Sequence, residues 1–336
     1  MLHDLIEELR EKRSLDDRKL LRLLENNDPE TEARLQAAAR ETAVAQFGKC
    51  VWLRALIEWS NRCRNDCYYC GIRRSNRSVR RYSLTQDEIL SCCEQAWNLG
   101  LRTFVLQGGE NPVEAKDLAK TVTSIRAAWP DAAITLSLGE LPRDTYALLR
   151  RCGANRFLLR HETANPSHYA QLHPGPMKLE SRLECLRTLR ELGYQTGMGM
   201  MVGSPFQTPL DLLADIRLIE SFRPEMIGIG PFIPHRDTPF RDFAAGSTDL
   251  TLRLYAILRL MLPTVWMPAT TALATLRPDG RTAGILAGAN VLMPNFTPAA
   301  YRGDYALYEG KARPDAEAIE NLNQLKHELD TIGYHV

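Results

Sequence analysis

The feature that most constrains the fold of this 336-residue chain is a repeated alternation of short apolar runs with longer helical stretches. Eight apolar runs have the character of buried strands, and helical periodicity fills most of the gaps between them. A strand followed by a helix before the next strand predicts parallel pairing. We expect the strands at residues 51–60, 103–109, 133–139, 156–162, 195–203, 226–232, 264–271 and 290–295.

Eight such units predict an α/β fold of the TIM type, a closed (β/α)8 barrel with an N-terminal helical extension. Helices are expected at residues 85–99, 113–128, 142–152, 178–192, 209–222 and 248–262, and Thr85 with Glu88 forms a capping box, with Gly100 as the C′ glycine. Ser14, followed by acidic residues, predicts a helix N-cap near the start of the chain. The seventh helix, around residues 283–288, is short, so barrel closure is least well specified there.

We divide the chain into three parts. Residues 1–48 read as a helical extension without strands, residues 49–312 as the barrel, and residues 313–336 as a helical tail. Polar or glycine-rich clusters follow most of the expected strands. Active sites of (β/α)8 barrels lie at these strand ends, whereas an open doubly wound sheet would bind ligands at one switch point.

Composition limits the partners and the compartment. The net charge of +1 argues against broad binding to nucleic acid, and no run of about 18 apolar residues predicts a membrane span. The N-terminal sequence is charged and amphipathic, unlike a secretory signal. Eight cysteines in such a chain indicate reduced thiols and a metal rather than disulfides, so we expect a cytoplasmic protein.

Three of these cysteines, Cys63, Cys67 and Cys70, stand in the run CRNDCYYC directly after the first expected strand. Three thiolates can hold three irons of a [4Fe-4S] cluster, which usually takes four cysteines, and so leave one iron open for chemistry. The alternative is a structural zinc site. Such sites use four ligands, usually in two pairs, and no second CxxC pair occurs in the chain.

The spacing CxxxCxφC, where φ is an aromatic residue, resembles that of the radical S-adenosylmethionine (radical SAM) superfamily. Longer segments resemble one family within it, the [FeFe]-hydrogenase maturase HydE. The resemblance runs in order over nearly the whole chain to about Lys311. Its most specific segments are RHETANP at 160–166 and IGIGPFIPHRDTP at 227–239, and other matching segments include TFVLQGGENP, MPNFTP and YRGDYALYEGK.

The resemblance implies one [4Fe-4S] cluster on Cys63, Cys67 and Cys70, with S-adenosyl-L-methionine (SAM) bound at its open iron. Some HydE proteins carry further cysteines near the C-terminus for a second cluster, but none follows Lys311 here. The residues expected to bind SAM lie at the ends of the second and fourth strands and in the helix that follows the fourth; they are Gly108, Gly109, Glu110, Glu162 and Arg182.

The fourth strand also places Arg160 and Glu162 on one face and His161 on the other, since side chains alternate along a strand. Arg160 and Tyr305 are expected to be catalytic, and Thr135, Ser137, Thr270, Thr271 and Met293 to line the substrate cavity. A salt bridge between Arg160 and Glu162 is the alternative. His235 and Asp237 are expected to order their loop rather than bind metal, and the loop 275–279 has no assigned role.

The resemblance implies an enzyme that generates a 5′-deoxyadenosyl radical for assembly of the [FeFe]-hydrogenase active-site cluster (H-cluster). Its substrate would be an iron-containing small-molecule precursor, and its partners other hydrogenase maturases (HydG, HydF) and a reducing electron donor. Two alternatives stay open. One is radical chemistry on an organic substrate, as in methylornithine synthase (PylB) or biotin synthase. The other is a non-catalytic iron–sulfur carrier.

Overall fold

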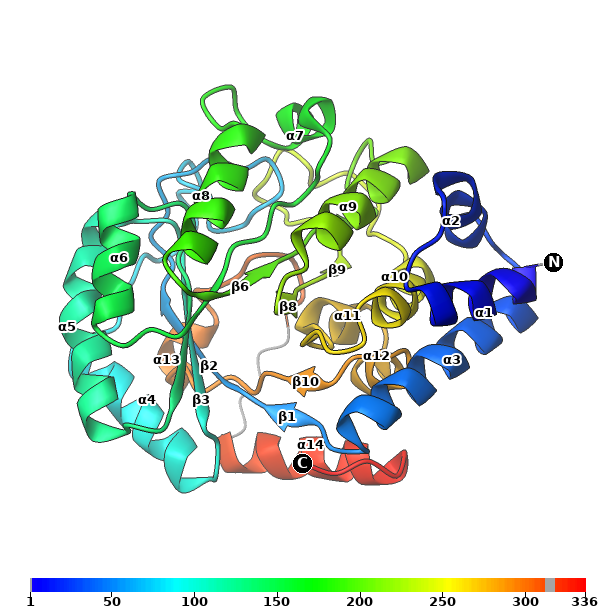
Figure 1. Cartoon of the computed structure of the whole chain (residues 1–336). Coiled ribbons are helices and arrows are strands. Elements are labelled where there is room, and N and C mark those ends of the chain that lie inside the picture. Colours follow the sequence, from blue (N-terminus) through cyan, green and yellow to red (C-terminus); the bar gives the residue numbers. More distant parts are fainter. Residues whose placement is uncertain (1, 312–317) are drawn as a thin grey trace.

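The computed structural model describes residues 2–311 and 318–336, which form a parallel barrel surrounded by helices (Figure 1). Six strands make one parallel sheet in chain order, β2-β3-β4-β5-β6-β8. Two short pairs, β1 with β10 and β7 with β9, extend it. The strands are β1 Trp52–Leu53, β2 Ala55–Ser60, β3 Thr103–Gly108, β4 Ala133–Ser137, β5 Arg156–Leu158, β6 Gln195–Met198, β7 Met201–Val202, β8 Met226–Ile227, β9 Gly230–Pro231 and β10 Val291–Leu292.

The ring closes through single bridges, so the barrel prediction is confirmed. Met226 pairs with Trp266, Pro268 with Val291, and Leu56 with Asn295, all in parallel. The seventh expected strand, residues 264–271, is reduced to these bridges. One reason is Pro268, which has no N–H to donate to a ladder. Residues 264–271 nevertheless occupy the place of a strand between β8 and β10.

The helices that cover the strands agree with the expected ones to within one or two residues at each end. They are α4 Gln86–Asn98, α5 Pro112–Ala128, α6 Arg143–Arg151, α8 Leu179–Glu191, α9 Pro209–Phe222 and α10 Thr248–Met261. Thr85 and Glu88 make the expected capping box, and Gly100 has φ +90°. The seventh helix is replaced by two short ones, α11 Thr271–Leu276 and α12 Gly280–Leu286, and α7 Pro166–Leu172 and α13 Ala299–Arg302 are additional.

Three helices precede the barrel: α1 Leu2–Lys12, α2 Asp17–Leu24 and α3 Pro29–Phe47. They lie along α9 and α10, with the ion pair Arg253–Glu32 (2.7 Å) joining α10 to α3. The prediction that Ser14 is an N-cap is wrong, because Asp16 caps α2 instead. The Asp16 carboxylate accepts a hydrogen bond from the backbone N–H of Lys19, three residues later, as N-cap side chains do.

The last helix, α14 Ala318–Thr331, lies at the end of the barrel opposite α7 and α8 (Figure 1). The final residues continue the barrel wall, because His335 pairs with Cys50 just before β1. The boundary at 48/49 stays a prediction, and the one at 312/313 lies outside the described residues. In the part of the chain that is described, no helix is long and apolar enough to cross a membrane.

Candidate active site at the barrel mouth

The loop that follows β2 carries Cys63, Cys67 and Cys70 at the carboxyl ends of the strands, near α7 and α8 (Figure 1). It is held in place on both sides. The Tyr68 N–H donates to the Leu172 carbonyl (3.0 Å) and the Gly71 N–H to the Leu307 carbonyl (2.8 Å). The three cysteines are therefore presented by a braced loop at the barrel mouth.

The chemistry of the three cysteine thiols is set by their burial in the loop. Burial raises the pKa of all three thiols, to about 12 for Cys70, and neighbouring cysteines raise the pKa of Cys67 and Cys70 further, so the protonated forms are favoured until a metal replaces the protons. Among the described residues, no three His, Cys, Asp or Glu side chains converge as around a single metal ion. The three thiols are near one another but too far apart to bind one metal ion together, which fits a cluster in which each thiolate ligates a different iron. On binding, iron would replace the thiol protons.

The glycine turn after β3 packs directly on this loop. The Gly109 N–H donates to the Ser60 carbonyl (2.8 Å), and a Cβ at Gly109 would collide with Arg62 and Cys63. Glycine is thus needed here for close approach. At Gly108 there is more space, because an added Cβ would come no closer than 3.3 Å to its nearest neighbour, the Trp59 ring.

Glu110 has its carboxylate already engaged. Oε1 accepts two hydrogen bonds from Arg64 (2.9 and 2.8 Å), and Oε2 accepts from the Glu140 N–H (2.8 Å). The side chain is buried and fastens the cysteine loop to the turns after β3 and β4. A direct bond from Glu110 to a ligand ammonium would have to displace or share these partners.

Glu162 and Arg182 both lie close to the cysteines. Glu162 raises the pKa of the Cys70 thiol, and Arg182 opposes the rise at Cys67, so both side chains reach the thiols. Glu162 has φ +67°, a strained backbone for a non-glycine residue, which persists where surrounding structure enforces it. Burial disfavours the charge of Arg182, but Tyr169 and the carboxylates of Glu110 and Glu140 raise its pKa overall.

His161 points away from the mouth, as strand alternation predicts. Its Nε2 lies 3.0 Å from Asp215 Oδ1 on α9, and both side chains are fully buried. The same oxygen accepts from the Ala164 N–H (2.6 Å). This pair secures the turn after β5 to the helix layer.

Deeper in the barrel, several buried polar atoms have no partner. They include Nε of Arg160 and the Thr135 hydroxyl. Arg160 and Glu162 form an ion pair at 3.0 Å, so the expected alternative is present, but hydrogen-bonding capacity is left over. Buried groups are normally matched, so unmatched polar atoms inside the barrel indicate the seat of a polar ligand.

A second group deeper in the barrel joins β2 to the segment after α13. Lys311 donates to Glu58 and to the Tyr305 carbonyl (2.8 Å), and Asn295 donates to Glu58 (3.0 Å). Thr271 and Met293 line a small cavity beside this pair rather than the Arg160 group. Sequence reasoning missed Glu58, although a carboxylate within an apolar strand requires a buried partner.

A histidine–tyrosine group behind the cysteine loop was also missed. His173 Nδ1 lies 3.0 Å from the Tyr169 carbonyl, which can only accept, so Nδ1 carries the proton. Nε2 is then the acceptor for the Tyr69 hydroxyl (3.0 Å). Burial lowers the pKa of His173 to about 3, so the ring stays neutral and fixes the aromatic residue next to Cys70.

The remaining predicted residues have structural partners or stand at the rim. Ser137 ends β4, half-buried, and Tyr305 is buried with its hydroxyl accepting from Gln107 (3.3 Å). His235 accepts from the Asp237 N–H (3.1 Å), which orders the loop. In the loop 275–279, Arg277 pairs with Asp279 through two 2.7 Å bonds.

Comparison with known proteins identifies this arrangement. The family model described as "Radical SAM superfamily" matches residues 57–219, from β2 to α9. The chain is 44% identical over 92% of its length to the [FeFe] hydrogenase maturase subunit HydE of Thermotoga maritima, covering 88% of that protein. The chain belongs to the HydE family of radical SAM enzymes. The family is the one that the sequence motifs predict.

Two further comparisons place this HydE-family chain among more distant relatives. It is 28% identical over 95% of its length to the 3-methylornithine synthase of Methanosarcina barkeri, covering 89% of that protein. A crystal structure of methylornithine synthase (PylB) superposes with a TM-score of 0.85 at 26% identity, covering 98% of this chain and 96% of the other. The barrel is thus shared, and the higher identity favours HydE over an organic-substrate enzyme.

The cofactors predicted from the sequence are those of the family, a [4Fe-4S] cluster and SAM. The site fits both groups. Three interacting thiols suit the cluster, and a glycine turn that approaches the cysteine loop leaves room beside it. Unmatched buried donors and acceptors suit a ligand that carries an ammonium, a carboxylate and hydroxyls.

Proposed function

We propose that this protein acts in assembly of the H-cluster of [FeFe]-hydrogenase, as a HydE-type radical enzyme. The observation that carries the proposal is the 44% identity to a HydE maturase along nearly the whole chain, combined with the unmatched polar atoms at the mouth. When bound, the reduced cluster supplies the electron that cleaves SAM into methionine and a 5′-deoxyadenosyl radical.

The residues proposed to hold these groups divide by position. Cys63, Cys67 and Cys70 would ligate the cluster. Glu162 and Arg182, which both lie close to the thiols, would take the polar groups of SAM beside the turn Gly108–Gly109. Glu110 would act through its bonds to Arg64 and Glu140, holding the turn against the cysteine loop.

The substrate is proposed to sit below, against Arg160. Its free donors suit a carboxylate or another anion, since a guanidinium binds such groups with two parallel bonds. Thr135, Ser137 and Thr270 would complete this seat, with Tyr305 as the further catalytic candidate. Thr271 and Met293, proposed from the sequence for the same seat, line the separate small cavity beside Glu58 and Lys311. These residues suit a cysteine-bound Fe(CO)2(CN) precursor, small and polar, delivered by a partner maturase.

Partners and location follow from the same proposal. HydG and HydF would supply and receive the iron-containing species, and a low-potential protein would deliver electrons. We propose that the protein works in the cytoplasm, where thiols remain reduced.

The test begins with anaerobic reconstitution, iron counting and an assay for 5′-deoxyadenosine. We expect about four irons per chain and 5′-deoxyadenosine under reducing conditions. Cys67→Ala should lower SAM cleavage by at least about a thousandfold, since a ligand to the cluster is lost, while circular dichroism stays native. A Cys67→Ala protein that still cleaves SAM would show that the triad does not hold the cluster.

The substrate is tested separately. Conversion of the synthetic iron precursor, followed by infrared bands of its CO and CN groups, should require SAM and fail in Arg160→Gln. Lysine serves as the control substrate because of the methylornithine synthase relatives. Conversion of lysine to methylornithine would replace the proposed function, and absence of 5′-deoxyadenosine with every substrate would favour a carrier.

A further inference from the structure

Positive charge is concentrated around the cysteine loop. Residues 61–81 contain seven arginines and a single acidic residue, Asp66, whereas the whole chain has a net charge of only +1. The rest of the chain is therefore net negative. A local field of this kind attracts acidic partners and speeds their association.

Several of these arginines are used within the molecule. Arg64 bonds Glu110, Arg73 bonds Asp66 (2.8 Å), and Arg81 donates to four backbone carbonyls. Arg74 and Arg77 are different. Both are exposed, and no carboxylate in the described part of the chain is paired with either.

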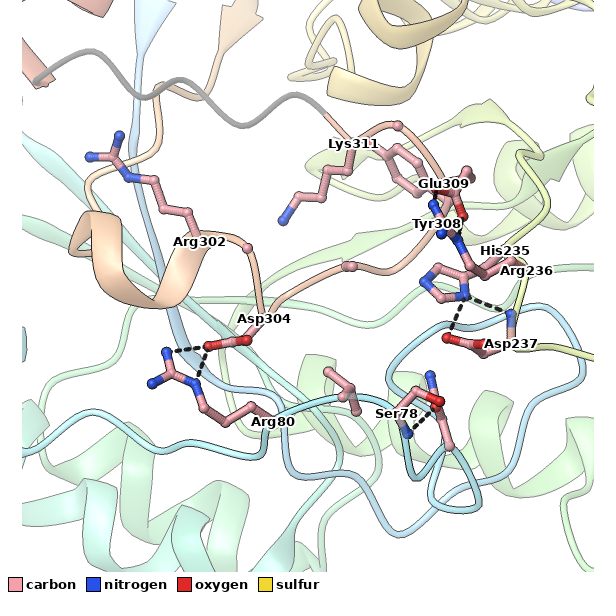
Figure 2. A pocket seen from close by; sticks show the side chains of 15 residues that line it. Ser78, Arg80, His235, Arg236, Asp237, Arg302, Asp304, Tyr308, Glu309 and Lys311 are labelled. Atoms are coloured by element: carbon pink, nitrogen blue, oxygen red, sulfur yellow. Dashed lines mark hydrogen bonds and ion pairs between the residues drawn. The ribbon is translucent and has the colours of Figure 1, made fainter.

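Beside them run two adjoining grooves. One, of about 440 Å³, is lined by Arg73, Arg77, Arg236 and Arg241, with Asp237 as its one acidic residue. The other, of about 680 Å³, shares Ser78, Arg236 and Asp237 with it (Figure 2). In the larger groove, dashed lines join Arg80 to Asp304, and Arg236, which lines both grooves, pairs with Glu309. In the smaller groove Arg241 lies 3.4 Å from the exposed Asp242, so the positive charge without an ion pair there belongs to Arg77.

An aromatic patch borders the smaller groove. Phe206 is 53% exposed and Phe243 38%, their rings 5.4 Å apart, and both contact Phe240 next to Arg241. Phe206 has φ +68°, and Gln207 braces its turn with bonds to Gly203 (2.6 Å) and Met201 (2.9 Å). A strained residue that presents an aromatic ring to solvent is a reason to look for function.

The patch and the grooves adjoin the loop that is proposed to hold the cluster. The Arg73 N–H donates to the Cys70 carbonyl (3.1 Å), and the Phe240 N–H donates to the Tyr68 carbonyl (3.3 Å). Arg74 is four residues from Cys70, so their Cα atoms lie within about 14 Å. A protein docked on this face would place its own redox group near the cluster.

We infer that the face formed by Arg74, Arg77, Arg241, Phe206 and Phe243, here called the docking face, binds an acidic one-electron carrier protein. The inference rests on the proposed function, since only a cluster that is reduced in turnover needs such a partner. Arginine and aromatic residues are the types enriched at interfaces, and small transient interfaces are typical of electron-transfer partners. One electron leaves the reduced carrier and enters the cluster, and no bond is made or broken.

The probe is an acidic flavodoxin, and the tested protein is the reconstituted holoprotein. Binding of oxidised flavodoxin is measured by calorimetry at low and high salt. The rate of cluster reduction by reduced flavodoxin, and by dithionite, is followed by the electron paramagnetic resonance signal of the reduced cluster. None of these measurements requires SAM cleavage, so a failure of the proposed function appears separately, as absence of 5′-deoxyadenosine with dithionite.

Two variants address the two parts of the docking face. Arg74→Glu with Arg77→Glu should weaken flavodoxin binding at least about tenfold and slow reduction by flavodoxin to match, because attraction becomes repulsion. Phe206→Asn should weaken binding severalfold, and asparagine tolerates the positive φ. Reduction by dithionite should be unchanged in both, since this small ion needs no docking.

The matched control is Arg18→Glu with Arg151→Glu, two exposed arginines on α2 and α6 whose reversal changes the net charge equally. It should bind flavodoxin like the wild type. Equal weakening in the control would attribute the effect to overall charge and overturn the docking face. So would unchanged binding in the double variant, or an equal slowing of reduction by dithionite.

Discussion

Two arginines, the half-buried Arg160 inside the barrel and the fully buried Arg259 in the helix layer, show how differently the same side chain is used. Arg259 on α10 is fully buried, and it donates to the carbonyls of Pro263, Val265 and Gly288 and to the Asn290 side chain. Arg160 is paired with Glu162 through Nη2, but its Nε has no hydrogen-bond partner. A matched buried arginine stabilises the fold, whereas an unmatched donor is what a ligand-binding arginine is expected to show.

The largest effect on stability is expected at the matched arginine. Arg259→Met should lower the free energy of unfolding by about 3 kcal/mol, because several buried oxygens lose their donor. Burial lowers the pKa of Arg259 to about 9, so relief from burying the charge offsets part of the loss. Thermal unfolding checks this, and SAM affinity at low temperature should not change. An Arg259→Met protein as stable as the wild type would show that the matched hydrogen bonds of Arg259 do not stabilise the fold.

At the mouth the order of effects should reverse. Glu162→Gln should raise the Kd for SAM about tenfold to a hundredfold, as expected for one charged hydrogen bond. The melting temperature should change little. Calorimetry on the reconstituted protein measures the affinity, with Glu191→Gln on the exposed side of α8 as the control. Unchanged SAM affinity would remove Glu162 from the proposed site.

The His173 group predicts a pH dependence of stability. Burial lowers its pKa from the ordinary 6.5 to about 3, so below pH 6.5 the unfolded chain binds a proton that the folded chain does not. Its contribution is complete above pH 6.5 and is lost as the pH falls toward 3, by about 1 kcal/mol at pH 5.5.

His173→Gln keeps an acceptor for Tyr69 but cannot titrate. Its melting temperature should therefore fall less than that of the wild type between pH 6.5 and 5.5, both measured on the apoprotein. Parallel pH profiles for the two proteins would contradict a neutral His173 in the folded state.

The smallest effect on stability is expected where a hydroxyl group without a hydrogen-bond partner is removed. Thr135→Val should change stability by less than about 0.5 kcal/mol, because the hydroxyl lost has no partner. Thr297→Val is the matched variant, since Thr297 is equally buried but accepts from the Glu58 N–H (2.8 Å), and it should cost about 1–2 kcal/mol. Equal losses in the two valine variants would show that Thr135 has a structural partner.

Much of the fold was accessible from local patterns. The capping box at Thr85 and the strand at residues 103–109 appear where the sequence predicts them, because caps and apolar periodicity act over a few residues. The seventh strand was harder, since its place in the ring depends on bridges to Met226 and Val291, far along the chain.

Only part of the site could be predicted from the sequence. The cysteine triad is a local motif, and the resemblance supplied Glu162 and Arg182. Nothing local shows that the Glu110 carboxylate is engaged by Arg64, or that Lys311 reaches Glu58 across the barrel. Such pairs form between segments that only the closed barrel brings together.

By itself, the sequence determined that the chain is a barrel of alternating strands and helices with three thiolates on one loop, because periodicity and ligand spacing are properties of neighbouring residues. Only the tertiary structure decided which buried polar groups are matched. Matching depends on whether a donor and an acceptor from distant segments meet at hydrogen-bonding distance. That distinction separates Arg259, whose donors are matched by buried oxygens, from Arg160, which is proposed to bind a ligand.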